Sequence, residues 1–174
     1  MSVLTTVFVG ASVDGFIARP DGALDWLPAV SEEHGFTELM ATVDAMVIGR
    51  GTFETVLGFT DWPYGQTPVI VLSSRPLDLS ALRDHPVEQM SGEPTEIVAR
   101  LEARGVKHIY VDGGITIQRF LRAGMIQRLI VTRVPVLIGQ GIPLFGALDA
   151  DVRLRHVRTR DFPSGLVQTE YLVD

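Results

Sequence analysis

The stretch Val111-Asp112-Gly113-Gly114-Ile115-Thr116 decides the predicted fold, because it joins an expected strand to an expected helix through two glycines. We expect a buried strand at Val106 to Val111 and a helix that ends near Gly124. Glycine lets a backbone approach a ligand closely, and the first turn of a helix presents free N–H groups with partial positive charge. The stretch therefore suits a pyrophosphate, although a tight turn with positive φ would use the same two glycines.

Two other predicted strand ends carry residues that could hold an anion. In Ile48-Gly49-Arg50-Gly51-Thr52 a strand again runs into a helix, and a guanidinium can hold a phosphate through two hydrogen bonds. Leu72-Ser73-Ser74-Arg75-Pro76 offers two hydroxyls and a guanidinium, which suit a phosphomonoester such as the 2′-phosphate of NADPH. Each motif alone could equally be a surface turn. Ligands of open α/β sheets bind outside the carboxyl ends of the strands, so the three motifs together indicate nucleotide binding.

Strands and helices alternate along two thirds of the chain. The other expected strands are Val3 to Ala11, Ala45 to Ile48, Thr67 to Leu72, Val87 to Met90 and Ile126 to Ile138. The other expected helices are Ser31 to about Val43, with Ser31 as its N-cap, Thr52 to Leu57 and Pro94 to Ala103.

The end of the chain predicts an antiparallel hairpin. Arg153 to Arg160 and Leu166 to Val173 alternate polar and apolar residues on either side of a proline–serine–glycine turn. Pro135 interrupts Ile126 to Ile138, so we expect that strand to be bulged or at a sheet edge. The whole pattern predicts one α/β domain over residues 1–174, with a mixed, mostly parallel central sheet and an antiparallel C-terminal hairpin.

Composition excludes several classes of protein. The chain has no cysteine, which rules out disulfides, zinc–thiolate sites and cysteine nucleophiles. A net charge of −6 argues against a nucleic-acid partner. We find no apolar run of about 18 residues, and no basic start with an apolar run behind it, so we expect no membrane partner and a cytoplasmic location.

Other common site motifs are absent from the sequence. It contains no GxGxxG after a strand, no GxxxxGK[ST] and no GxSxG, which argues against a standard Rossmann fingerprint, a P-loop and a nucleophile elbow. The four histidines show no metal-ligand spacing, so we predict no metal site. The expected partner is a small molecule.

Four segments, taken in order, resemble dihydrofolate reductase. They are Gly10 to Ala18, Met46 to Glu54, Val69 to Ser74 and Asp112 to Leu121. The resemblance implies a dihydrofolate reductase-like three-layer fold and NADPH as the cofactor. The segment Gln127 to Phe145 is most similar to the C-terminal reductase domain of the bifunctional riboflavin-biosynthesis deaminase–reductase. That resemblance implies NADPH-dependent reduction of a 5-amino-6-(5-phosphoribosylamino)uracil, or of a related pterin-like or pyrimidine-like substrate.

The resemblance also implies site residues. The residues that it places around the cofactor are Gly10, Ala11, Ile17, Gly49, Arg50, Thr52, Leu72, Ser73, Ser74, Arg75, Asp112, Gly113, Gly114, Ile115, Thr116 and Ile117. The candidates for catalysis are Asp14, Asp25, Glu32 and Thr132, and those for substrate binding are Trp26, Phe53 and Thr132. The relatives that it implies are homodimers, and we expect the apolar strand Leu129 to Ile138 and the terminal hairpin to form the dimer edge.

Two alternatives stay open. Val30 or Ser31 stands where the folate enzyme has its acid, and Gln66 and Thr67 stand where it has an arginine for the glutamate tail of folate. Both departures argue against folate reduction, and a true dihydrofolate reductase stays as one alternative on the strength of the resemblance. A non-catalytic ligand-binding protein on the same fold is the other, because fold alone does not determine function.

Overall fold

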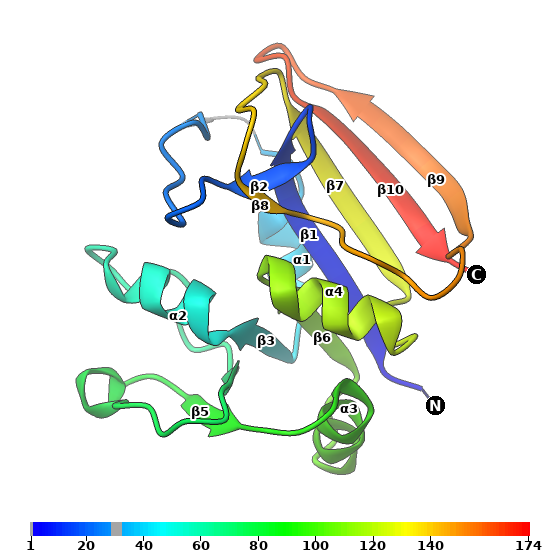
Figure 1. Ribbon diagram of the computed structural model, residues 1–174. Helices are drawn as coiled ribbons and strands as arrows, with labels where there is room; N and C mark the ends of the chain where they lie inside the picture. The colour runs from blue at the N-terminus through cyan, green and yellow to red at the C-terminus, as the bar shows by residue number, and fades with distance from the viewer. Residues whose placement is uncertain (1, 29–32) are drawn as a thin grey trace.

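Apolar, β-branched segments form the middle of an eight-stranded sheet with the strand order β5-β4-β3-β6-β1-β7-β10-β9 (Figure 1). The computed structural model describes residues 2–28 and 33–174. The strands of this sheet are β1 (Leu4–Ser12), β3 (Ala45–Gly49), β4 (Val69–Leu72), β5 (Val87–Met90), β6 (His108–Asp112), β7 (Arg128–Val134), β9 (Leu154–Asp161) and β10 (Val167–Val173). The pairs from β5 to β7 are parallel, and β10 pairs antiparallel with both β7 and β9. The mixed, mostly parallel sheet and the antiparallel hairpin are thus confirmed.

Helices cover the two faces of the sheet, which makes three layers. The helices are α1 (Phe36–Thr42), α2 (Arg50–Leu57), α3 (Pro94–Ala103) and α4 (Gly114–Arg122), with a 3-10 turn η1 (Ser80–Leu82). Ile97 of α3 and Phe120 of α4 are fully buried in one apolar cluster with Val7 of β1. Leu39 of α1 and Phe53 of α2 belong to a second cluster on the opposite face. Figure 1 shows α4 in front of the sheet and α1 behind it.

The helix expected from Ser31 is shorter than predicted. It begins at Phe36, with Gly35 as its N-cap at φ 96°, and ends at Thr42. Ser31 lies outside the described residues. Gly35 and Glu33 account for the late start, since the Glu33 carboxylate accepts hydrogen bonds from the Gly35 N–H and the Thr37 hydroxyl in a turn that precedes the helix.

The predicted strand Ile126 to Ile138 is wrong in place and in length. Strand β7 ends at Val134, one residue before Pro135, and it is paired on both sides, by β1 and by β10. Proline follows this strand and therefore removes no hydrogen bond from its ladder. The free edge on this side is β9 of the terminal hairpin, so the hairpin lies at the sheet edge as expected, whereas Leu129 to Ile138 does not. The homodimer itself stays a prediction.

A second, two-stranded ribbon lies where the sequence predicted only loops. It pairs β2 (Phe16–Ala18) with β8 (Ile142–Pro143). The carboxylate of Asp14 fastens the ribbon at its base, because it accepts hydrogen bonds from the backbone N–H groups of Ile138 and Gly139. Figure 1 shows the ribbon in front of the sheet near the start of α4.

The direction of the strand connections reverses between β3 and β6, which makes this point the topological switch point of the sheet. Strand β3 continues through α2 to β4 on one side, whereas its neighbour β6 continues through α4 to β7 on the other. Where adjacent connections leave in opposite directions, a crevice opens outside the carboxyl ends of the strands. Two of the three predicted anion-binding motifs therefore lie at this switch point.

Candidate functional site

The two strand-to-helix turns at the switch point, β3 to α2 and β6 to α4, pack against each other, with a threonine of each turn against a glycine of the other. A Cβ on Gly113 would lie 2.6 Å from the hydroxyl oxygen of Thr52. A Cβ on Gly49 would lie 2.6 Å from the hydroxyl oxygen of Thr116. Each glycine thus leaves room for the threonine of the other turn, and this contact sets the starts of α2 and α4 side by side.

Both helix starts are suited to an anion. The N-caps of α2 and α4 are Gly49 and Gly113, neither helix has a side-chain cap, and neither has an acidic residue in its first turn. The Arg50 guanidinium donates from Nε to Glu54 at 2.8 Å, while its Nη1 is buried without a partner among the described residues. Free N–H groups, two helix dipoles and an unpaired guanidinium nitrogen fit a pyrophosphate. These residues therefore fit the phosphates of a dinucleotide such as NADPH.

The two serines after β4 have different surroundings. The Ser73 hydroxyl donates to the Arg75 carbonyl and accepts from the Arg75 N–H, so it closes the turn after β4. In this structure the Ser73 hydroxyl is used by the turn, and its role as a phosphate ligand stays a prediction. Ser74 and Arg75 are exposed and extend beyond the strand end, where they remain suited to a 2′-phosphate. Leu72 is buried in the core beside them.

Gly114 is packed against protein. A Cβ there would lie 3.0 Å from Ile142 Cγ2 and 3.1 Å from both Ile17 Cδ1 and the Pro143 carbonyl oxygen. The close approach that this glycine permits is therefore to the β2–β8 ribbon. Farther along α4, Ile115 is exposed and Ile117 is fully buried in the core, so Ile117 supports the helix and does not touch a ligand.

Asp112 is the one carboxyl group within the described residues whose pKa is raised. It ends β6 at the switch point, and its Oδ1 accepts a hydrogen bond of 2.9 Å from the Gly113 N–H. Burial raises the pKa of Asp112 to about 6, against the lowering effect of that hydrogen bond. The Asp112 charge also helps to raise the pKa values of Tyr64 and Tyr110, behind the larger effect of their own burial. A group with a pKa near neutrality can both hold and release a proton.

The carboxyl groups predicted to be catalytic are less suited to donate a proton. A hydrogen bond with Ser12 lowers the pKa of Asp14, which also fastens the ribbon. The Arg19 guanidinium, 2.6 Å away, lowers the pKa of Asp25. Both are exposed and ionised at neutral pH. Glu32 lies outside the described residues.

The predicted nicotinamide end contains small and apolar residues. Gly10 lies near the carboxyl end of β1, and a Cβ there would lie 3.3 Å from Leu27 Cδ2. Ala11 is fully buried next to it. Ile17 of the ribbon packs against Gly114. The structure therefore brings Gly10, Ala11 and Ile17 to the same edge of the sheet as the starts of α2 and α4.

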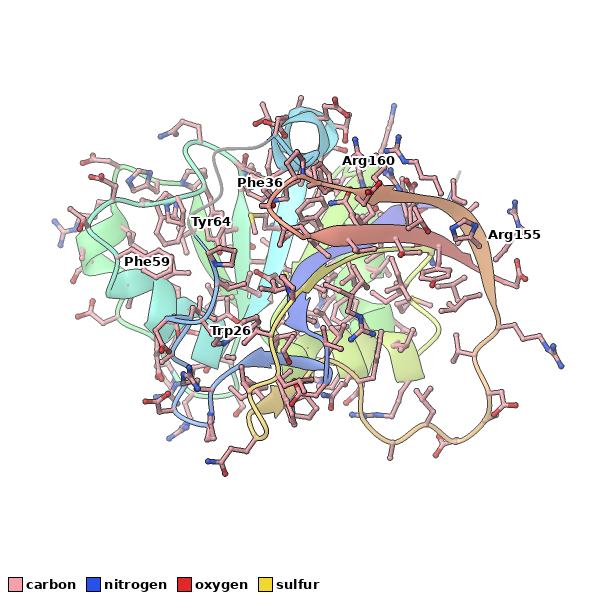
Figure 2. All side chains as sticks on the ribbon, turned by 90° about the horizontal axis from the view of Figure 1, so that it is seen from above. Trp26, Phe36, Phe59, Tyr64, Arg155 and Arg160 are labelled. Carbon is pink, nitrogen blue, oxygen red and sulfur yellow. The ribbon has the colours of Figure 1, made fainter. Side chains whose placement is uncertain are left out.

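Among the predicted substrate residues, Trp26 and Thr132 are at this edge, while Phe53 is a core residue of α2 with 2% exposure. The indole Nε1 of Trp26 is buried without a partner among the described residues, so it offers a donor. Figure 2 looks down on this edge and shows Trp26 and Tyr64 on its left half. The prediction missed Tyr64, Gln168 and Arg160, which lie in a loop and in a hairpin that looked purely structural.

The sequence matches the RibD C-terminal domain family over residues 4–168. The chain belongs to this family. YwjB of Bacillus subtilis (strain 168) is 31% identical over 172 residues, which cover 97% of each chain. The crystal structure of a putative riboflavin biosynthesis protein from Shewanella sp. PV-4 is 37% identical, with a TM-score of 0.91 over 98% of this chain and 99% of that one.

The dihydrofolate reductase-like fold is confirmed as well. The dihydrofolate reductase of Enterococcus faecalis, solved with NADP(H), has a TM-score of 0.69 to this RibD-family chain at 20% identity, over 98% of this chain and 96% of that one. None of the helices within the described residues is long and apolar enough to cross a membrane. Across residues 2–28 and 33–174, no group of three or more His, Asp or Glu side chains is placed to hold a metal ion.

Proposed function

We propose that this RibD-family domain is an NADPH-dependent reductase of the riboflavin-pathway type, which acts on a 5-amino-6-(5-phosphoribosylamino)uracil or on a closely related heterocycle. The observation that carries the proposal is the pair of uncapped helix starts beside the unpaired Nη1 of Arg50. Family membership supports reductase chemistry, and the fold is one that accommodates NADP(H) in a solved relative.

NADPH would supply the hydride, and this chain's residues would bind, orient and protonate. The starts of α2 and α4 would hold the pyrophosphate, and Ser74 and Arg75 the 2′-phosphate. Gly10 and Ala11, which are small, would lie near the nicotinamide at the carboxyl end of β1. Reduction of the ring-opened imine of such a substrate would leave the imine nitrogen in need of a proton. Asp112 is the group whose pKa allows it to give that proton, after which solvent reprotonates it.

The test is NADPH oxidation with two substrates in parallel. We expect turnover with 5-amino-6-(5-phosphoribosylamino)uracil and none with dihydrofolate. Turnover of dihydrofolate alone would make the protein a folate reductase, and no turnover with either, despite tight NADPH binding, would favour a binding protein. Asp112→Asn should retain NADPH affinity and lose turnover, and the parent's kcat should fall as pH rises above about 6, because the acid form of Asp112 is then lost.

Cofactor preference gives a second, independent test. A charge-assisted contact contributes roughly 1.5–3 kcal/mol, so Arg75 should favour NADPH over NADH by about ten- to a hundred-fold. Calorimetry on the parent and on Arg75→Met measures this. Equal affinities for the two cofactors in the parent would contradict the 2′-phosphate assignment. Arg83, an exposed arginine beyond the turn, provides a matched control through Arg83→Met.

A further inference from the structure

Four residues form one row across the sheet near the carboxyl ends of β1 and β7. The strand register places Gly10 beside Thr132, Thr132 beside Gln168, and Gln168 beside Arg160. Residues opposite each other on neighbouring strands project from the same face. The face is that of α1, because Gln168 and Arg160 both donate to the carbonyl of His34, just before that helix. Figure 2 shows Arg160 and Phe36, the first residue of α1, on the same side of the sheet.

Along this row, Arg160 donates a hydrogen bond to Gln168, and Gln168 donates one to Thr132. Arg160 Nη2 donates to Gln168 Oε1 at 2.8 Å. Gln168 Nε2 donates to the His34 carbonyl at 2.8 Å and to the Thr132 hydroxyl oxygen at 3.0 Å. Gln168 is 4% exposed and Thr132 is 5% exposed, so neither exchanges these partners freely with water.

The two ends of Gln168 fix the orientation of its amide. A guanidinium has no acceptor, so it must face the amide oxygen, and a carbonyl has no proton, so it must face the amide nitrogen. Rotating the amide by half a turn would break two hydrogen bonds at once, the one from Arg160 and the one to the His34 carbonyl. The amide nitrogen therefore always presents a proton to Thr132, and the Thr132 oxygen always accepts it.

The Thr132 hydroxyl must then point its own proton elsewhere. Gln168 is the only hydrogen-bond partner of the Thr132 hydroxyl within the described part of the chain, so this proton has no acceptor there. A buried donor without an acceptor is costly, and an acceptor from a ligand would remove that cost. Thr132 lies beside Gly10 in the strand register, near the carboxyl ends of β1 and β7, where the nicotinamide is expected.

We propose that Arg160 and Gln168 act as positioning residues that hold Thr132 as an obligatory hydrogen-bond donor, so that the site selects a heterocycle with a carbonyl oxygen or an unprotonated ring nitrogen at that point. The inference rests on the proposed function for the identity of the bound ring. It adds that Thr132 is the donor, and the ring the acceptor, in the hydrogen bond between them. A uracil ring, with two carbonyl oxygens, meets the requirement. A ring that presents only N–H or C–H groups there does not.

A double-mutant cycle tests the relay of hydrogen bonds from Arg160 through Gln168 to Thr132. The probe is 5-amino-6-(5-phosphoribosylamino)uracil. Thr132→Val should raise KM about tenfold, the value of one neutral hydrogen bond, while Thr132→Ser stays near the parent. Gln168→Glu keeps the shape but presents only acceptors, so the Thr132 hydroxyl turns toward it and KM rises by a similar factor. NADPH affinity should not move in any of these variants. Adding Gln168→Glu to Thr132→Val should cost nothing further, because no hydroxyl is left to turn.

If KM rose further in the double variant than in Thr132→Val alone, the relay would be refuted, because Gln168 would then act through the segment at His34. An unchanged KM in Thr132→Val would overturn the contact itself and leave the proposed function intact. If the parent turns over no substrate, or a variant fails to fold, neutron diffraction on the parent still decides. The relay requires the Thr132 hydroxyl deuterium to point away from Gln168, and a deuterium that points toward Gln168 refutes it.

Discussion

The hydroxyl of Thr52 lies against the bare α-carbon of Gly113, 2.6 Å from the position that a Cβ there would take. Gly113 also has φ 98°, a conformation that costs other L-residues about 1–2 kcal/mol. We predict that Gly113→Ala lowers the free energy of unfolding by about 2–4 kcal/mol, from strain and overpacking together. Urea denaturation measures the loss. Adding Thr52→Ala should recover the part due to the contact and leave the part due to φ, and strictly additive losses would contradict this contact.

Gly114 and Gly51 make a matched pair for the cofactor site. An alanine at Gly114 would push against Ile142, Ile17 and the Pro143 carbonyl, so Gly114→Ala should cost about 1–3 kcal/mol of stability by displacing the ribbon. Gly51, in the first turn of α2, has nothing within 4 Å of such a methyl group. Gly51→Ala should therefore stabilise the free protein by about 0.5–1 kcal/mol.

NADPH titration of these two variants tests where the pyrophosphate lies. A phosphate at the start of α2 would meet the new methyl group, so Gly51→Ala should bind NADPH more weakly although it melts at a higher temperature than the parent. Parental affinity in Gly51→Ala would place the phosphates elsewhere. Gly114→Ala should regain part of its stability when Ile17→Val is added, because that change removes Ile17 Cδ1, one of the atoms that the new methyl group meets.

Asp112 should destabilise the folded protein at neutral pH. Its pKa is about 6 in the folded chain against 3.8 for an ordinary aspartate, so folding favours the protonated form. The resulting penalty is absent below about pH 4, grows between pH 4 and 6 and is complete above that, at no more than on the order of 3 kcal/mol. Asp112→Asn should thus be more stable than the parent at pH 8 and equal to it near pH 4.

Urea denaturation of both proteins across this pH range measures the effect. His108, whose pKa is lowered by burial, and Glu170, whose pKa is lowered by Arg128 and Arg158 despite burial, also change stability with pH. They are present in both proteins, so their effects cancel in the difference. A less stable Asp112→Asn at pH 8 would show that the carboxylate has a stabilising partner.

We predict a homodimer that forms through β9. This edge strand exposes Leu154 and Val157 at 41% and 44%, and an uncovered edge with apolar side chains favours pairing with a second copy. Light scattering should give twice the chain mass of 19.1 kDa. Val157→Lys should give a monomer, whereas Val13→Lys, an exposed valine outside the edge strand, should remain a dimer. A monomeric parent at micromolar concentration would contradict the prediction.

The sequence predicted the strand ends of the site well because their signals are local. A glycine after a buried strand, followed by a helix, predicts the same turn wherever it occurs, and Gly49 and Gly113 both do so. It failed for Pro135, because a proline just past a strand and one within an edge strand look alike in one dimension. It did not anticipate the turn that Ser73 closes, because a turn-closing hydroxyl and a phosphate-binding hydroxyl follow a strand in the same way.

Gln168 shows why the rest was out of reach. In an alternating strand a glutamine predicts a solvent-facing position, yet Gln168 is buried because the segment at His34 packs on it from 134 positions away. Gly114 is similar, since the ribbon that crowds it comes from Ile17 and Ile142. Both depend on contacts between segments that no local pattern encodes.

The position of β6 has a consequence for how the protein is made. Strand β1 does not pair with β3, because β6 lies between them, and Leu4 faces His108. A chain that leaves the ribosome N-terminus first therefore presents β1 with neither neighbour until residues 108 to 134 have been synthesised. Nascent chains stalled before that point should remain open and sensitive to protease, and they should require chaperones to protect their apolar first strand.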